Sequence, residues 1–217
     1  MIELFNEDCM VVMSRYPDKY FDLACVDPPY GIGMDGGKYG INGAAQAQAY
    51  DKNDWDKSAP PLEYFVELTR VSKNQIIWGA NHFVDLIAKP SPCWIVWDKE
   101  KVGGFFADSE LAYTSFKTAV RNFKFQWHGM LQGDMKNKEQ RIHPTQKPVK
   151  LYDWLLHNYA KPGQRILDTH LGSGSSAIAA HYYGGDFVGC ELDEDYFNAA
   201  KKRFELATAQ TSLFDYV

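Results

Sequence analysis

The 217-residue chain has few cysteines and no long apolar run, and each absence excludes a class of protein. Its four cysteines, Cys9, Cys25, Cys93 and Cys190, stand singly, without a CxxC or a Cys/His pair. Neither a disulfide framework nor a structural zinc site is therefore expected. No stretch approaches the roughly 18 consecutive apolar residues that cross a bilayer, and the first residues are acidic where a signal peptide is basic. We expect a cytoplasmic protein with no metal and no membrane contact.

The charge is unevenly distributed along the chain. It carries 23 Lys and Arg against 28 Asp and Glu, yet Lys117–Lys150 holds eight basic residues and only two acidic ones. Aromatic side chains and His128 are interleaved with these basic residues. A basic patch on an acidic body is typical of contact with a polyanion, although a solvated surface loop would have the same composition.

Apolar runs and amphipathic runs alternate along the chain, which predicts alternating buried strands and helices. Such alternation predicts an α/β fold with a mostly parallel sheet and helices on both faces, whose ligands gather at the carboxyl ends of the strands. Two polar stretches, 31–58 and 129–145, predict long loops. The predicted strands cover 21–26, 75–78, 93–97, 111–115, 165–167 and 187–190, and the predicted helices cover 9–16, 62–71, 81–88, 149–159, 175–183 and 196–207.

The run Arg165–Ser176 predicts a strand, a glycine turn and the start of a helix. Gly172 and Gly174 let the backbone bend tightly and approach a ligand closely. The next predicted strand ends at Glu191, whose carboxylate could hold a ribose diol. These features predict a nucleoside pocket. A dinucleotide fits less well, because the third glycine of GxGxxG is missing and Asp168 would repel a pyrophosphate.

The predicted strand at 21–26 is followed by Asp27, Pro28, Pro29 and Tyr30. Two consecutive prolines end the strand and fix the turn. The Asp27 carboxylate and the Pro28 carbonyl can together accept both protons of an amino group, which turns its lone pair toward an electrophile. Tyr30 offers a flat face to a planar base. This arrangement predicts chemistry on an exocyclic amine.

Together these motifs resemble those of the amino-group DNA methyltransferases that use S-adenosylmethionine. Asp27–Tyr30 is similar to the family's catalytic motif, and Asp168–Ser175 is similar to its cofactor loop. His143–Pro148 resembles the cofactor motif that precedes a helix, and Asn6–Cys9 resembles a segment that contacts the adenine of the cofactor. The catalytic motif comes first and the cofactor loop last, as in the permuted beta group, and the match spans nearly the whole chain.

The resemblance implies a Rossmann-like class I methyltransferase fold, S-adenosylmethionine as cofactor and double-stranded DNA as partner. It implies methyl transfer to the exocyclic amine of a flipped-out base, N6 of adenine rather than N4 of cytosine. The implied catalytic residues are Asp27, Pro28, Pro29 and Tyr30. The implied cofactor-binding residues are Asp8 and Cys9 for the adenine, Glu191 for the ribose, Thr145, Lys147 and Asp168 for the methionine part, and His143, Gly172, Ser173 and Gly174.

One position departs from the family's pattern, which usually has Pro-Phe after the loop aspartate where this chain has Thr169-His170. We expect a formed pocket here nonetheless, with different packing beside the methionine end. We expect one methyltransferase domain over 1–217, with loop insertions at about 31–58 and 99–142 that read DNA and a tail at 209–217. The segment Trp78–His82 follows a strand end and could line the pocket or fill the core.

The tail gives a separate signal, because Gln210–Phe214 resembles the pentapeptide with which bacterial proteins bind the sliding clamp. Packing of the same apolar residues on the sheet, or on a dimer mate, is the alternative. Monomer and homodimer both remain open, and the resemblance implies a bacterial or phage-infected cell. The alternative functions are N4-cytosine methylation, methylation of a protein or a free nucleotide, and a noncatalytic DNA-binding or clamp-binding module.

Overall fold

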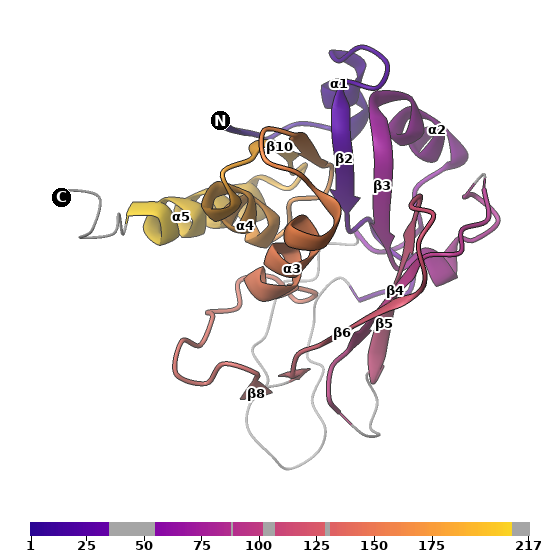
Figure 1. Ribbon diagram of the computed structural model, residues 1–217. Helices are drawn as coiled ribbons and strands as arrows, with labels where there is room; N and C mark the ends of the chain where they lie inside the picture. Colours follow the sequence, from indigo (N-terminus) through magenta and orange to yellow (C-terminus); the bar gives the residue numbers. More distant parts are fainter. Residues whose placement is uncertain (35–54, 88, 102–106, 129–130, 210–217) are drawn as a thin grey trace.

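The computed structural model describes residues 1–34, 55–87, 89–101, 107–128 and 131–209. In these residues the main sheet has the strand order β1-β10-β9-β2-β3-β5-β4-β6 (Figure 1). Neighbouring strands run parallel except where β5 pairs with β3 and with β4. The strands are β1 (Ile2–Phe5), β2 (Phe21–Val26), β3 (Ser72–Trp78), β4 (Trp94–Asp98), β5 (Ser109–Thr114), β6 (Arg121–Lys124), β9 (Arg165–Asp168) and β10 (Asp186–Cys190).

Helices cover both faces of this sheet, as the alternating pattern predicts. On one face lie α1 (Cys9–Ser14) and α2 (Leu62–Val71), and on the other lie α3 (Val149–Tyr159), α4 (Ser175–Tyr183) and α5 (Glu194–Ala209) (Figure 1). A mostly parallel sheet with helices on both faces is the predicted α/β architecture.

The two faces each bury their own apolar cluster because side chains on a strand alternate between faces. Leu23 and Cys25 of β2 pack toward α3, α4 and α5, whereas Ala24 and Val26 pack toward α1 and α2. The same alternation separates Ile166 from Leu167 in β9. Because both faces are buried, these strands are nearly continuous apolar runs, which is why the sequence identifies them.

The strand order reverses between β9 and β2. From β9 the chain continues through α4 to β10, and from β2 it continues through α2 to β3, so the two connections diverge to opposite sides. β9 and β2 nevertheless pair directly, with Leu23 opposite Ile166. In an open α/β sheet, ligands bind in the crevice outside the carboxyl ends of the strands at such a reversal.

The predicted helix over 81–88 is wrong. The structure has a single 3-10 turn, η1 (Ala80–His82), and then only turns up to residue 87. Phe83 has φ −147° and ψ 38°, outside the helical region, and it is the one fully buried side chain of 81–87, with Val84 57% exposed. A helix here would have no apolar face to pack, and packing provides most helical stability.

The sequence patterns also missed four short strands. β1 pairs with the edge strand β10, and β6 pairs with β4. A hairpin of β7 (Trp127–His128) and β8 (Leu131–Gln132) lies partly within the predicted loop 129–145. In the described part of the chain, no helix combines the length and the apolar character needed to cross a membrane. The predicted clamp-binding tail, 210–217, and most of loop 31–58 lie outside the described residues.

Candidate active site

Carboxylate side chains gather where neighbouring strands end along one edge of the sheet. Asp27 follows β2, Asp168 ends β9, Glu191 follows β10 and Asp8 lies three residues after β1. On the other side of Asp27, Glu110 occupies the second position of the reversed strand β5. The order of the strands therefore sets the order of these residues, with the predicted cofactor residues on one side of β2.

Asp27 is the centre of a buried polar cluster. Its Oδ1 accepts a hydrogen bond from Tyr30 Oη at 2.8 Å, and its Oδ2 accepts one from Lys147 Nζ at 2.6 Å. The side chains of Asp27 and Lys147 are 15% and 3% exposed. Burial raises the pKa of Asp27, and Lys147 opposes that rise while Glu110 adds to it. The predicted catalytic carboxylate thus lies in a site where N–H and O–H donors converge on it.

Glu110 joins this cluster from β5. Its Oε2 lies 3.0 Å from Lys147 Nζ and 3.4 Å from Tyr30 Oη, and its Oε1 lies 2.5 Å from Lys99 Nζ. Burial alone would raise the pKa of Glu110, but the two ammonium groups outweigh burial and lower it to about 2. Glu110 is therefore ionised at every physiological pH.

Asp56 fixes the backbone that follows the two prolines. Its carboxylate accepts hydrogen bonds from the amides of Tyr30 and Gly31 at 2.7 and 2.8 Å through Oδ1, and from Met34 at 2.7 Å through Oδ2. Because Asp56 is buried, these three donors satisfy a carboxylate that burial would otherwise penalise. Pro28 is buried and Pro29 is partly buried, so the whole motif is held in one conformation.

The ring of Tyr30 packs on the backbone after β3. Gly79 has φ +67°, and a Cβ built on it would lie 2.0 Å from Tyr30 Cε1. His82 stacks on the Tyr30 ring at 5.2 Å with an interplanar angle of 19°. Trp78 is buried, with Lys147 Nζ 5.4 Å from the centre of its ring. Trp78 and His82 thus lie beside the catalytic motif, so this segment lines the site.

The predicted cofactor loop begins at Asp168, which is buried. Its Oδ2 accepts a hydrogen bond from Ser176 Oγ at 2.6 Å, and its Oδ1 accepts one from the His170 amide at 3.1 Å. Burial raises the pKa of Asp168 to about 7, although both hydrogen bonds lower it. Asp168 is therefore poised between a neutral acid and a carboxylate near neutral pH.

Glu191 lies against the glycine turn. Its Oε2 accepts the Gly172 amide at 2.8 Å and its Oε1 accepts the Asp193 amide at 3.1 Å. Each carboxylate oxygen can accept a second hydrogen bond, so both oxygens keep capacity for a diol. Gly172 has φ +51° and Gly174 has φ +74°, which explains why glycine occupies both positions.

The segment after β1 contacts the backbone of Glu191. Asn6 Nδ2 donates to the backbone carbonyl of Glu191 at 2.8 Å. The side chain of Asp8 caps α1 by accepting the amides of Met10 and Val11 at 2.8 and 3.3 Å. Burial, with the charge of Asp8, raises the pKa of the Cys9 thiol to about 12. Cys9 is therefore a neutral, weakly polar surface for a ligand.

The segment His143–Pro148 bridges the two halves of the site. Burial lowers the pKa of His143 to about 3, so its ring is neutral, and its Nδ1 lies 3.1 Å from Thr145 Oγ1. Trp127 Nε1 donates to the carbonyl of Gln146 at 2.7 Å. The carbonyl of Lys147 accepts Ser175 Oγ at 2.8 Å. The backbone of this segment therefore contacts the start of α4, and its Lys147 side chain contacts Asp27.

The glycine turn is also held from α5. The guanidinium of Arg203 donates to the Ser173 carbonyl at 2.7 Å and to Ser175 Oγ at 2.9 Å. It also donates to Glu139 Oε2 at 2.6 Å. Glu139 in turn accepts the first amide of α3, from Val149, at 3.0 Å. Arg203 thus links the predicted cofactor turn to the segment that leads into α3.

The pair Thr169-His170 is accommodated by Tyr64 of α2. Tyr64 Oη lies 2.6 Å from Thr169 Oγ1, which lies 3.0 Å from His170 Nδ1. The rings of Tyr64 and His170 meet edge to face at 5.3 Å. Burial lowers the pKa of His170 to about 4, so this hydrogen-bonded chain is uncharged. Thr169 and His170 are thus held by satisfied polar contacts with α2.

The basic stretch divides into two groups. Lys147 is buried in the site, whereas six of the other residues are exposed: Lys117, Arg121, Lys124, Lys136, Lys138 and Lys150. The aromatic residues between them pack inward, with the Phe123 ring tilted against Trp154 at 5.4 Å and Trp127 buried under Arg141 at 4.4 Å. The exposed cations suit phosphate contacts, but these aromatic rings are not free to stack on bases.

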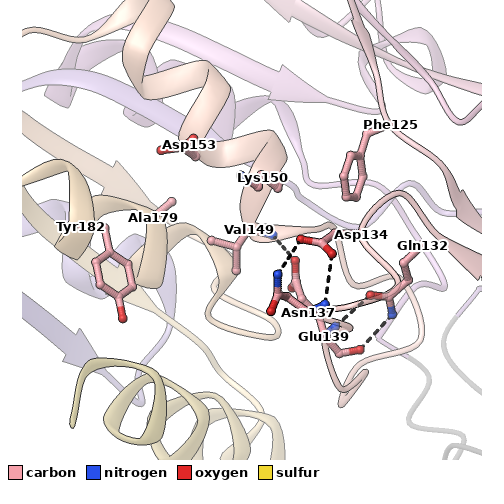
Figure 2. A pocket seen from close by; sticks show the side chains of 10 residues that line it. All are labelled: Phe125, Gln132, Asp134, Asn137, Glu139, Val149, Lys150, Asp153, Ala179 and Tyr182. Atoms are coloured by element: carbon pink, nitrogen blue, oxygen red, sulfur yellow. Dashed lines mark hydrogen bonds between the residues drawn. The ribbon is translucent and has the colours of Figure 1, made fainter. Parts of the chain in front are cut away.

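A cavity of about 330 Å³ lies apart from the predicted site residues. Figure 2 shows it between α3, α4 and the segment 132–139, with Asp134 bound to Asn137 and Gln132 bound to Glu139. None of the predicted catalytic or cofactor residues lines this cavity.

Comparison with known proteins assigns the chain to a family. Residues 73–202 match the sequence profile of the N6/N4 methyltransferases, described as DNA methylase. This chain belongs to that DNA methylase family. It is an amino-group DNA methyltransferase, and the family uses S-adenosylmethionine.

Relatives and solved structures agree with this assignment. The methyltransferase is 25% identical to the type II methyltransferase M2.MboI of Moraxella bovis, over 94% of this chain and 88% of that protein. The M1.HpyAVI–SAM complex has 20% identity and a TM-score of 0.61, over 94% of this chain and 100% of that one. The cytosine-N4-specific PvuII DNA methyltransferase has 11% identity and a TM-score of 0.62, over 96% of this chain and 90% of that one.

Sequence reasoning missed two residues of this methyltransferase's site. Asp56 and Glu110 lie 26 and 80 residues from the Tyr30 that they contact. Gly79 belongs to the predicted segment Trp78–His82, and a glycine directly after a strand often marks a close approach of another group.

We predict that Gly79→Ala damages the site more than Gly163→Ala. Both glycines have positive φ, so each substitution costs about 1–2 kcal/mol through the backbone. A Cβ at Gly163 meets nothing within 4 Å, whereas one at Gly79 collides with Tyr30. Urea unfolding and methyl transfer should therefore show a further loss in stability and a large loss of activity for Gly79→Ala alone. Equal effects of the two substitutions would contradict the packing described here.

Proposed function

We propose that this methyltransferase transfers a methyl group from S-adenosylmethionine to N6 of adenine in double-stranded DNA. The observation that carries the proposal is the Asp27 carboxylate, held at the end of β2 with donors 2.8 and 2.6 Å from its two oxygens. A group that already accepts O–H and N–H donors at both oxygens can accept the protons of an exocyclic amine in the same way.

Asp27, Pro28, Pro29 and Tyr30 act by alignment and electrostatics. The Asp27 carboxylate and the Pro28 carbonyl accept the two N–H groups of the amine and so direct its lone pair. The bound cofactor would supply the methyl group from its sulfonium, whose C–S bond would break with the electron pair left on sulfur as the N–C bond forms. The amine nitrogen would become positive in this transition state, where the negative charge of Asp27 stabilises it, and would then lose a proton to water.

The residues at the ends of β1, β9 and β10 suit the cofactor, which supplies a methyl group on a positively charged sulfur when bound. Glu191 keeps hydrogen-bonding capacity for the ribose diol, and Asp8 and Cys9 at the start of α1 are the proposed contacts of the adenine. Asp168 supplies negative charge near the methionine part, beside Gly172, Ser173 and Gly174. His143 and Thr145 lie across this turn, since a Cβ on Gly172 would come 3.9 Å from His143 Nδ1.

The target base must leave the duplex to reach Asp27, because the carboxylate is largely buried at a strand end. The exposed cations of Lys117–Lys150 support contacts with the DNA backbone beside the site. We place the remaining DNA-reading contacts in the stretches at about 31–58 and 99–142. The second stretch is not the loop that the sequence predicts, because it contains β5 and β6 of the main sheet and the hairpin of β7 and β8.

Cytosine N4 is the second candidate target. The solved PvuII enzyme, which has a similar fold, is cytosine-N4-specific, and both bases present an NH₂ group to the same acceptors. The Asp-Pro-Pro-Tyr form of the motif favours adenine by resemblance. Sliding-clamp binding through Gln210–Phe214, a monomeric or homodimeric state and a cytoplasmic location also remain predictions.

We predict that the base labelled by this enzyme is adenine and that Asp27 is required. The protein is incubated with S-adenosylmethionine carrying a labelled methyl group and mixed-sequence duplex DNA, and the digested nucleosides are separated. Labelled N6-methyl-2′-deoxyadenosine, lost in Asp27→Ala, is expected, because removal of one catalytic interaction typically lowers the rate about 100-fold or more. Label in N4-methyl-2′-deoxycytidine would overturn the adenine assignment, and label that persists in Asp27→Ala would overturn the mechanism.

We also predict that cofactor affinity depends on Asp168 and on pH. The cationic cofactor prefers the carboxylate form, and burial raises the pKa of Asp168 to about 7. The Kd for S-adenosylmethionine, measured by calorimetry, should therefore increase by up to about tenfold per pH unit as the pH falls below 7. Asp168→Asn should weaken binding and remove this dependence, whereas Glu191→Gln should weaken binding and keep it. A dependence that survives in Asp168→Asn would refute the assignment.

A further inference from the structure

Lys147 occupies the position on Asp27 that a target amine needs. Its ammonium group contacts three acceptors, which are Asp27 Oδ2 at 2.6 Å, Tyr30 Oη at 3.0 Å and Glu110 Oε2 at 3.0 Å. An ammonium has three N–H donors, so all three are used. In this state the charge of Asp27 is neutralised, and the carboxylate cannot fully stabilise a second positive charge.

Glu110 offers the alternative partner for this lysine. It contacts the same Lys147 ammonium as Asp27, and it remains ionised because Lys147 and Lys99 lower its pKa to about 2. If Lys147 gives up Asp27, it keeps a charged acceptor and the Tyr30 hydroxyl. Without Glu110, a Lys147 ammonium that moved away from Asp27 would lose its carboxylate partner while buried, which is strongly unfavourable.

We propose that Glu110 is a positioning residue that holds Lys147 away from Asp27 when the target base enters, so that Asp27 can accept the amine. This inference rests on the proposed function, because it requires an exocyclic amine as the group that binds Asp27. Glu110 touches neither the base nor the cofactor in this role. Its effect reaches the reaction through Lys147, and Lys99 holds the second oxygen of Glu110 at 2.5 Å so that the carboxylate stays aimed at the site.

The test compares Glu110→Gln with Glu67→Gln. Both carboxylates are 20% exposed and paired with a cation, but Glu67 pairs with Arg70 on α2, away from the site. Single-turnover methyl transfer at saturating cofactor and DNA should be at least about 30-fold slower in Glu110→Gln, since about 2 kcal/mol of transition-state stabilisation is lost. Glu67→Gln should stay within threefold of the unaltered enzyme. A normal rate in Glu110→Gln overturns the proposal.

A binding measurement distinguishes positioning from general damage. DNA carrying the target base is compared with DNA whose target base lacks only the exocyclic amine, in the presence of S-adenosylhomocysteine. The unaltered enzyme should prefer the amine-bearing base, and Glu110→Gln should lose that preference, because Lys147 still covers Asp27. A slow variant that keeps the full preference overturns the proposal.

Two controls keep the result interpretable. If Glu110→Gln does not fold, as judged by urea unfolding, Glu110→Asp keeps the charge but shortens the reach. It is expected to lose part of the preference, and a full preference in that variant overturns the proposal. If the unaltered enzyme methylates no base, the proposed function fails. If the unaltered enzyme and Glu110→Gln both methylate at the normal rate, only the role of Glu110 is refuted.

Discussion

The burial of the Asp27 carboxylate is the constraint on which the rest of the site depends. A carboxylate at a largely buried strand end needs donors and positive charge nearby, or it becomes protonated. Tyr30 and Lys147 supply the donors. Lys147 then needs further negative charge because it is buried too, which explains Glu110, and Glu110 in turn pairs with Lys99. One buried charge thus requires a cluster drawn from β2, β5 and the segment before α3.

The fold brings the cofactor half and the target half together at one point. The strand order reverses between β9 and β2, so Asp168 and Asp27 lie at the carboxyl ends of directly paired strands although they are 141 residues apart in the chain. His143–Pro148 spans both halves, since the Lys147 carbonyl holds Ser175 and the Lys147 side chain holds Asp27. A change at the cofactor turn therefore has a short route to the catalytic carboxylate.

The local motifs could be predicted from the sequence, whereas the residues that support them could not. Asp27–Tyr30 and Gly172–Gly174 form turns that depend on proline or glycine, and such turns leave a local signal. Glu110 and Asp56 are ordinary carboxylates whose roles arise only when β5 and the end of loop 31–58 fold against Tyr30. The prediction of a helix over 81–88 was wrong because periodicity alone does not show whether an apolar face has anything to pack against.

In the proposed reaction, Asp27 exchanges Lys147 for the target amine. A crystal structure with S-adenosylhomocysteine and DNA that contains the target base observes this exchange directly. The exocyclic nitrogen is expected within hydrogen-bond distance of an Asp27 oxygen, with Lys147 Nζ moved from Asp27 and retained on Glu110. A flipped base whose amine binds elsewhere, while Lys147 stays on Asp27, would rule out the exchange.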